Sequence, residues 1–360
     1  MSFFNLPPGY KFKLKSMPRG RHYPPGSITN SCNVPFKSLV VDFNGQCLVC
    51  QCDGWLPIPV GHALEFDSLE QVFSSKIAKI LQQDVAEKKF TWCAIEHCGI
   101  QWANQYKKDF NLQINVDESC NLTCPSCRRH NIMITDGPEF EIKKKILTNI
   151  MTWLDKFEHP ILITMSGNGD PLASAIIRPL FIDFVCKPTQ KFILHTNGLL
   201  IDKVLHKSKI VPNLAQIIIS VDAGSSETYH EIRRGGNWST LIRNLDYLYQ
   251  QNLMHLVSLQ FCLQQKNWHD LENFAKLCEH YRCHGKVHKL DDWGTWNNTS
   301  TDHPDDWTLA NGYFRDQDVS EASHPSWRQC RELVMNLLTR ESIKITDPVI
   351  DRFGLRTNND

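Results

Sequence analysis

From about residue 111 to residue 290 the sequence repeats one pattern, in which a short apolar strand precedes a loop and an amphipathic helix. Alternating apolar residues predict a strand from Asn111, and helical periodicity predicts the helices. Further strands are expected at 161–165, 192–195, 216–221, 256–263 and 286–290, and helices at 141–157, 173–186, 199–207, 238–250 and 268–281. Such alternation predicts an α/β fold with six parallel strands, whose chemistry lies on the loops after the strands.

The first strand leads directly into three cysteines with C-x3-C-x2-C spacing, at Cys120, Cys124 and Cys127. Three thiolates at this spacing can converge on one soft metal centre and leave a coordination position open. Three protein ligands favour a reactive centre, whereas a structural zinc site needs a fourth. His130 is the nearby candidate for that alternative.

The loops after the later strands carry polar and glycine residues. Ser166-Gly-Asn-Gly-Asp170 has two glycines that admit a ligand close to the backbone, and a carboxylate that can accept hydrogen bonds from an ammonium group. Thr196-Asn-Gly198 and Ser220-Val-Asp222 follow the next two strands. Arg233 or Arg234 can supply a guanidinium that grips a carboxylate with two hydrogen bonds.

A smaller cysteine-rich module precedes the repeat. A strand at 38–43, the hairpin turn Asn44-Gly45 and a helix that begins after Ser68 separate Cys32 from a terminal pair, Cys93 and Cys98. So small a core would depend on a metal centre that clamps its two ends. Zinc remains the alternative metal, because cysteine spacing alone does not separate it from an iron–sulfur cluster.

Together, the cysteine loop and the downstream turns resemble the radical S-adenosylmethionine (SAM) superfamily over roughly residues 28 to 296. The resemblance implies a partial (β/α)6 TIM-like barrel in which Cys120, Cys124 and Cys127 hold a 4Fe-4S cluster whose open iron binds SAM. It also implies reductive cleavage of SAM to a 5′-deoxyadenosyl radical, which abstracts hydrogen from a substrate carbon. The residues that it places around SAM are Ser166, Gly167, Gly169, Asp170, Asn197, Ser220, Asp222, Arg233 and Leu263.

The cysteine-rich module resembles the auxiliary-cluster module called SPASM, or its shortened twitch form. Its position before the core is similar to that in radical SAM proteins with an N-terminal twitch domain. The resemblance implies a second 4Fe-4S cluster held by Cys32, Cys50, Cys93 and Cys98, with Cys47 or Cys52 as possible substitutes. Cys330, in a predicted helix at 327–338, is either a hydrogen-atom donor, an extra cluster ligand or a core cysteine.

These features divide the chain into a basic leader (1–27), an auxiliary-cluster domain (28–104), a radical SAM core (105–296) and a C-terminal extension (297–360). A net charge of +0 gives no sign of a dedicated nucleic-acid binder. The absence of an apolar span or signal-peptide pattern, with 14 cysteines, predicts a cytoplasmic protein that uses thiols as metal ligands.

Peptide or protein modification by oxidation, crosslinking or epimerisation is the expected function, because auxiliary modules are frequent among relatives that modify peptides. Dehydrogenation or epimerisation of a carbohydrate or small molecule is the runner-up. Either requires a reducing partner such as flavodoxin or ferredoxin. A zinc-binding scaffold without catalysis is the alternative from another class.

Overall fold

A computed structural model describes residues 28–50, 56, 58–93, 95, 98–101, 103–127, 131–166, 169–291 and 314–355. The chain divides into two compact units. One comprises residues 1–112 and 149–159, and the other comprises residues 113–148 and 160–360. The strand β4 (Phe110–Ile114) and the helix α4 (Gly137–Lys156) cross the boundary between them.

The larger unit is built on a parallel sheet with the strand order β5, β6, β7, β8, β9, β10. These strands are β5 (Ile161–Met165), β6 (Gln190–Thr196), β7 (Leu214–Ser220), β8 (Val257–Leu263), β9 (His284–Lys289) and β10 (Ile343–Ile345). The predicted α/β class with parallel strands is thereby confirmed. It follows from the repeated strand-helix pattern, because parallel neighbours need a crossover connection.

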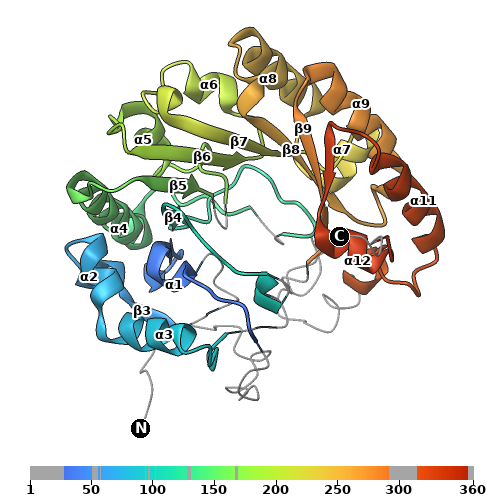
Figure 1. The fold of residues 1–360 in the computed structure, drawn as a ribbon. Coiled ribbons are helices and arrows are strands. Elements are labelled where there is room, and N and C mark those ends of the chain that lie inside the picture. The colour runs from blue at the N-terminus through green and yellow to red at the C-terminus, as the bar shows by residue number, and fades with distance from the viewer. Residues whose placement is uncertain are drawn as a thin grey trace. The chain divides into compact units, whose positions relative to one another are not determined.

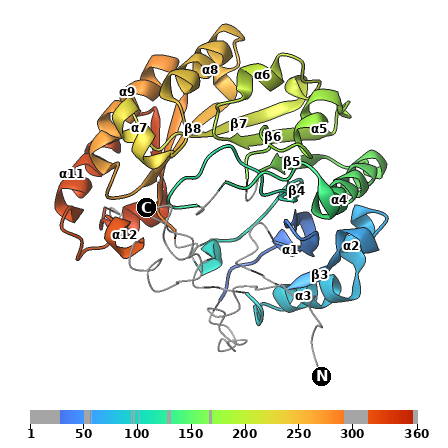
Figure 2. The ribbon, with the colours of Figure 1, turned by 180° about the vertical axis from the view of Figure 1, so that it is seen from behind.

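Helices cover one face of this sheet. Figures 1 and 2 both show α5 (Arg178–Asp183), α6 (Ile201–Leu205), α8 (Trp238–Gln250) and α9 (Leu271–Tyr281) along the outer face of the strands. The strand side chains that face these helices are apolar and fully buried, among them Phe192, Leu194, Ile217, Ile219, Leu259 and Phe261. Because successive strand residues point to opposite faces, the intervening residues form the inner face. That inner face is polar and carries His195, Ser220, Gln260 and His288.

The extension after the predicted barrel adds to the same unit. Its helix α11 (Trp327–Leu337) contacts α9, and β10 pairs in parallel with β9. A final helix, α12 (Asp347–Arg352), contacts β9. Among the described residues, no helix combines the length and the hydropathy that a membrane span requires.

The smaller unit contains an antiparallel sheet of β1 (Ser38–Val41), β2 (Gln46–Leu48) and β3 (Pro59–His62). The turn between β1 and β2 forms at Asn44-Gly45, where Gly45 has a φ of 79°. The Asp42 carboxylate accepts hydrogen bonds from the amides of Asn44 and Gln46 and fixes this turn. The hairpin expected from the Asn-Gly dipeptide is therefore present.

The single helix expected after Ser68 is wrong, because the segment forms two helices, α2 (Leu69–Ser74) and α3 (Lys76–Ala86). Ser75 breaks it by leaving the helical conformation and accepting a hydrogen bond from the Ala78 amide, which caps α3. The break separates Val72, which is buried, from Ile80, which is 51% exposed. These two residues therefore do not belong to one continuous apolar stripe.

Candidate functional site

The cysteine loop follows β4 and lies among the loops at the carboxyl ends of the parallel strands. Cys124 is buried, Cys127 is exposed and Cys120 is half-buried. The backbone of Cys120 pairs with Ile132, and its Sγ accepts a hydrogen bond from the Leu122 amide at 3.4 Å. The three thiols thus lie on an irregular segment that is anchored at Cys120.

The turn after β6 reaches this loop through Asn197. Its Nδ2 donates to Asn121 Oδ1 at 2.8 Å and to Cys120 Sγ at 3.8 Å. Gly198 follows in a left-handed conformation with a φ of 85°, and a Cβ there would clash with Ile219 and Leu241. The glycine therefore permits the turn that carries Asn197 to the cysteines.

Asp170 connects two of the predicted SAM-binding turns. Its Oδ2 accepts hydrogen bonds from the Thr196 hydroxyl and from the Asn197 amide at 2.6 Å. Its Oδ1 accepts from the amides of Leu172 and Ala173, and the residue is 2% exposed. Burial raises the pKa of Asp170, while these hydrogen bonds lower it. In this structure the carboxylate holds neighbouring turns together, a role that the sequence analysis did not include.

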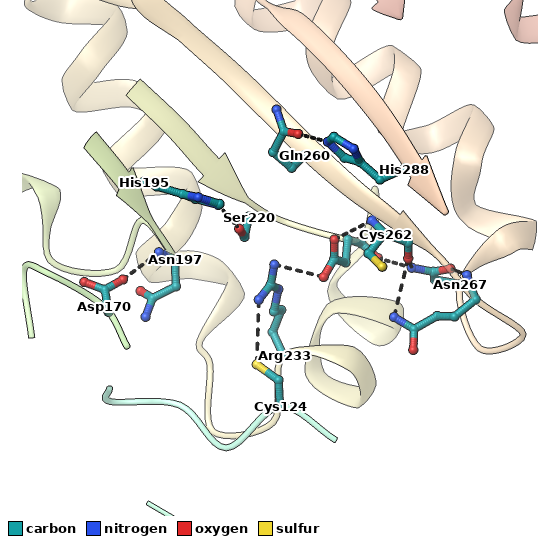
Figure 3. Close-up of polar contacts among 12 residues, drawn as sticks. Cys124, Asp170, His195, Asn197, Ser220, Arg233, Gln260, Cys262, Asn267 and His288 are labelled. Carbon is teal, nitrogen blue, oxygen red and sulfur yellow. Dashed lines mark hydrogen bonds and ion pairs between the residues drawn. The ribbon is translucent and has the colours of Figure 1, made fainter. Parts of the chain in front are cut away.

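Arg233 is the cation of the site. Its guanidinium forms an ion pair with Asp222 Oδ2 at 2.9 Å and donates to Cys124 Sγ at 3.7 Å. Figure 3 shows it extending from beside Cys124 toward the end of β7, which carries Ser220. Asp222 is itself fixed, because its Oδ1 accepts from the Cys262 amide at 2.7 Å and its φ is 57°. Asp222 therefore forms an ion pair within the site.

The electrostatics of this pair follow from its burial. Burial alone would lower the pKa of Arg233, but Asp222 and Cys124 raise it above its ordinary value. Burial raises the pKa of the Cys124 thiol, whereas Arg233 lowers it. Burial outweighs the cation, so the pKa of this thiol stays raised, and Arg233 reduces the cost of forming the thiolate that binds metals.

One buried polar atom of Arg233 and one of Tyr229 suit a bound polar ligand. Arg233 Nε and the Tyr229 hydroxyl have no hydrogen-bond partner among the described residues. Buried polar groups normally have partners, so such atoms point to an unfilled polar contact. A SAM molecule with its charged amino and carboxylate groups suits this donor set.

Arg234, the competing candidate, has another role. Its Nε donates to the Thr123 carbonyl at 2.7 Å, and the Thr123 amide donates back to the Arg234 carbonyl. Arg234 therefore holds the backbone of the cysteine loop, while Arg233 points into the site.

The remaining predicted SAM-binding residues are distributed as follows. Ser220 Oγ lies 3.0 Å from His195 Nε2 on the inner face of the sheet (Figure 3). Ser166 Oγ accepts a hydrogen bond from Gln113 at 3.4 Å, and Gly169 packs directly against the Ser119 carbonyl. Leu263 is buried at the end of β8, and Gly167 lies outside the described residues. Their roles toward SAM stay predictions.

Cys330 lies on the helix α11. It is fully buried in a helix that contacts α9 and β10, and burial raises its pKa to about 12. The structure thus places it among core residues of the outer helical layer. Its suggested role as a hydrogen-atom donor stays a prediction.

In the smaller unit, the four predicted auxiliary-cluster cysteines are neighbours. Burial raises the pKa of Cys93, and the nearby thiols of Cys50, Cys32 and Cys98 raise it further. Cys32, Cys93 and Cys98 also pack against the apolar cluster of Val85, Phe90, Ile95 and Ile100. Within the described residues, no three Cys, His, Asp or Glu side chains are arranged to share a single metal ion.

The two proposed substitutes differ from that group. Cys47 is fully buried on β2, and its charged neighbours are Asp42 and Glu65 rather than other cysteines. Cys52 lies outside the described residues. The proximity of the four cysteines favours the original set, which stays a prediction.

Tyr229 is a site residue to which sequence reasoning gave no role. Its ring is fully buried, its hydroxyl lacks a partner among the described residues, and a Cβ on Gly236 would meet that ring at 2.8 Å. The signal available was its position four residues before Arg233 on the short helix α7 (Ser226–Ile232). Residues so spaced lie on one helical face, which here directs both toward the cysteine loop.

Two inner-face histidines predict a pH dependence of stability. Burial, together with the charge of Arg233, lowers the pKa of His195 to about 4. Burial, Lys286 and His195 lower that of His288 to about 4, and Asp291 opposes the shift. An unfolded histidine titrates near pH 6.5, so the unfolded chain binds more protons between about pH 6.5 and 4.

Both histidines therefore stabilise the fold fully above about pH 6.5, and this stability is lost as the pH falls toward 4. We expect a cost of order 2 kcal/mol for each at pH 4.5. Urea unfolding at pH 7 and 4.5 should show a smaller acid loss for the His195→Gln/His288→Gln variant than for the wild type. Equal losses would contradict the assignment.

Known proteins are similar in sequence to the larger unit. The profile of the Radical SAM superfamily matches residues 114–278. GTP 3′,8-cyclase of Alkaliphilus metalliredigens (strain QYMF) is 27% identical over 175 residues, which cover 46% of this chain and 51% of that protein. The chain thus spans about half the length of this curated relative.

Solved structures of low identity are also similar to part of the chain. The structure described as native anSMEcpe with bound AdoMet and Cp18Cys peptide has 17% identity, a TM-score of 0.36 and coverage of 50% of both chains. A radical SAM methyltransferase from Sphaerobacter thermophilus has 13% identity, a TM-score of 0.40 and coverage of 66% of both. The structure of TYW1 with a lysine-pyruvate adduct bound has 22% identity, a TM-score of 0.33 and coverage of 47% of this chain and 61% of that chain.

The matched profile covers the cysteine loop, the turns after β5 to β8 and the Asp222–Arg233 pair. Members of this superfamily are enzymes that use a 4Fe-4S cluster and SAM. Residues 114–278 of this chain are therefore similar to a radical SAM domain.

Proposed function

We propose that this protein is a radical SAM enzyme that removes a hydrogen atom from a carbon of a peptide or protein substrate. The observation that carries the proposal is the convergence on the cysteine loop of Arg233, at Cys124, and Asn197, at Cys120. When bound, the cluster and SAM supply one-electron cleavage of SAM to methionine and a 5′-deoxyadenosyl radical, with the electron delivered by a reducing partner such as flavodoxin or ferredoxin.

The residues of this chain have separate tasks in that proposal. Cys120, Cys124 and Cys127 hold the cluster, and Arg233, held by Asp222, receives the SAM carboxylate together with Ser220. Asp170 keeps the turns after β5 and β6 in register, so that Asn197 stays on the cysteine loop. Positioning of this kind is the usual contribution of a protein to cofactor chemistry.

The choice of a peptide substrate rests on the four neighbouring cysteines of the smaller unit, which we propose hold a second 4Fe-4S cluster. Such a cluster could accept the electron that the substrate radical must lose for oxidation or crosslinking. The products would then be an oxidised or crosslinked peptide, or an epimer where a hydrogen atom is returned instead.

A small-molecule substrate is the second candidate, because the curated relative is named as an enzyme acting on GTP. The polar inner face of the sheet also favours a hydrophilic ligand, since it carries Gln260 and His288 in mutual hydrogen-bond contact (Figure 3). Incubation of the enzyme with a peptide and, separately, with a nucleotide distinguishes the two candidates. The substrate is the compound that changes in mass while SAM is irreversibly consumed.

The test is anaerobic reconstitution of the wild type and of the Cys120→Ala/Cys124→Ala/Cys127→Ala variant, with iron, sulfide and zinc counted per chain. We expect about eight irons in the wild type and about four in the variant. With SAM and dithionite, only the wild type should form 5′-deoxyadenosine. Zinc without iron, and no cleavage of SAM, would leave the zinc scaffold as the function.

A further inference from the structure

A cavity of about 400 Å³ lies at the amino-terminal ends of β7, β8 and β9. The predicted SAM-binding residues follow the carboxyl ends of these strands, so the cavity lies at the other end of the sheet. Its volume is within the range of small-ligand sites. The polar side chains that line it include Gln216, His255, Ser258, His284, Lys286 and Lys344.

Two lysines lie side by side in this cavity. Lys286 on β9 and Lys344 on β10 are direct partners in the parallel register. A Cβ on Gly285 would meet Phe274 and Cys278 of α9, so Lys286, the next residue, points to the opposite, inner face. Like charges on neighbouring strands destabilise a sheet, and the partial burial of Lys286 adds to this cost, whereas Lys344 is exposed.

No protein group offsets these charges within the described part of the chain. Neither lysine has an ion pair there, and the one carboxylate lining the cavity, Glu341, is exposed and forms none with them. Lys143 provides the contrast, because this buried lysine lies near two carboxylates, Glu118 and Glu139. Burial, followed by the charge of Lys344, lowers the pKa of Lys286.

We propose that this cavity is an oxyanion site, in which the neighbouring side chains of Lys286 and Lys344 bind one phosphate group together. The Ser258 hydroxyl and the imidazoles of His255 and His284 supply further hydrogen-bond donors around it. Phosphate accepts hydrogen bonds through several oxygens, and its negative charge would offset the repulsion between the two lysines. The phosphate is either a free ion or part of a larger ligand such as a nucleotide, and the chemistry of recognition is the same.

Isothermal titration calorimetry at low salt, with inorganic phosphate and separately with GTP, tests this site on the full chain. The variants are Lys286→Gln and Lys344→Gln, with Lys276→Gln on the exposed face of α9 as the matched control. We expect wild type and control to bind phosphate alike, and each cavity variant to bind at least about tenfold more weakly.

A thermal measurement separates binding from a structural role of the lysine. Without phosphate, Lys286→Gln should melt no lower than the wild type, because the repulsion is removed. With phosphate, only the wild type and Lys276→Gln should gain stability.

Competition between GTP and phosphate would identify the phosphate as part of a larger ligand, whereas binding of phosphate alone would identify a free ion. No binding of either probe to the wild type, or equal binding by Lys286→Gln, would overturn the site. Because no step requires SAM cleavage, the result is independent of the proposed radical chemistry.

Discussion

Replacing Asp222 by asparagine should lower the free energy of unfolding of the cluster-free protein by about 3 kcal/mol. The substitution keeps an oxygen that can accept from the Cys262 amide, and asparagine tolerates the left-handed conformation of residue 222. It removes only the charge that pairs with Arg233. Because both side chains are largely buried, at 8% and 14% exposure, the guanidinium would be left as an uncompensated internal charge.

The control is Glu231→Gln, which breaks an ion pair with Lys266 of the same 2.9 Å length. That pair is 50% and 33% exposed, so its loss should cost at most about 1 kcal/mol. Urea unfolding of the three proteins at neutral pH measures both values. Similar losses for the two variants would mean that water or another group satisfies Arg233 in the absence of Asp222.

The sequence predicted the repeating elements well, for a physical reason. Buried strands and amphipathic helices produce a local periodicity of apolar residues in the sequence, and the helix expected at 238–250 coincides with α8. Ser75 shows the limit of this reasoning. A serine at the surface can continue a helix or cap a new one, and the choice depends on how the next turn packs.

The candidate site was predictable in its residue types but not in its contacts. The Arg-Arg dipeptide at 233–234 gave no way to tell which guanidinium faces the cysteines, because the end of α7 sets that direction. Asp170 was expected to face a ligand, yet four hydrogen bonds within the chain engage it. These pairings join residues that are far apart in sequence, so no local pattern encodes them.

A matched pair of cysteine variants should separate the auxiliary centre from the SAM-binding cluster. In Cys93→Ser/Cys98→Ser, iron should fall from about eight to about four per reconstituted chain, while SAM is still cleaved to 5′-deoxyadenosine. Both residues neighbour Cys32, and all three pack against one apolar cluster in the smaller unit. Loss of the metal should also lower the melting temperature of that unit, because so small a core depends on its metal centre for stability.

Cys47→Ser is the control, since Cys47 is equally a buried cysteine of this unit but neighbours Asp42 and Glu65. It should keep about eight irons. Loss of four irons from Cys47→Ser but not from Cys93→Ser/Cys98→Ser would show that the ligand set is wrong. The wild type could instead hold four irons and one zinc, with the zinc released only by the Cys93 and Cys98 substitutions. That result would assign the same cysteines to a structural zinc site. The cysteine positions would then stand, and the substrate electron would need another acceptor.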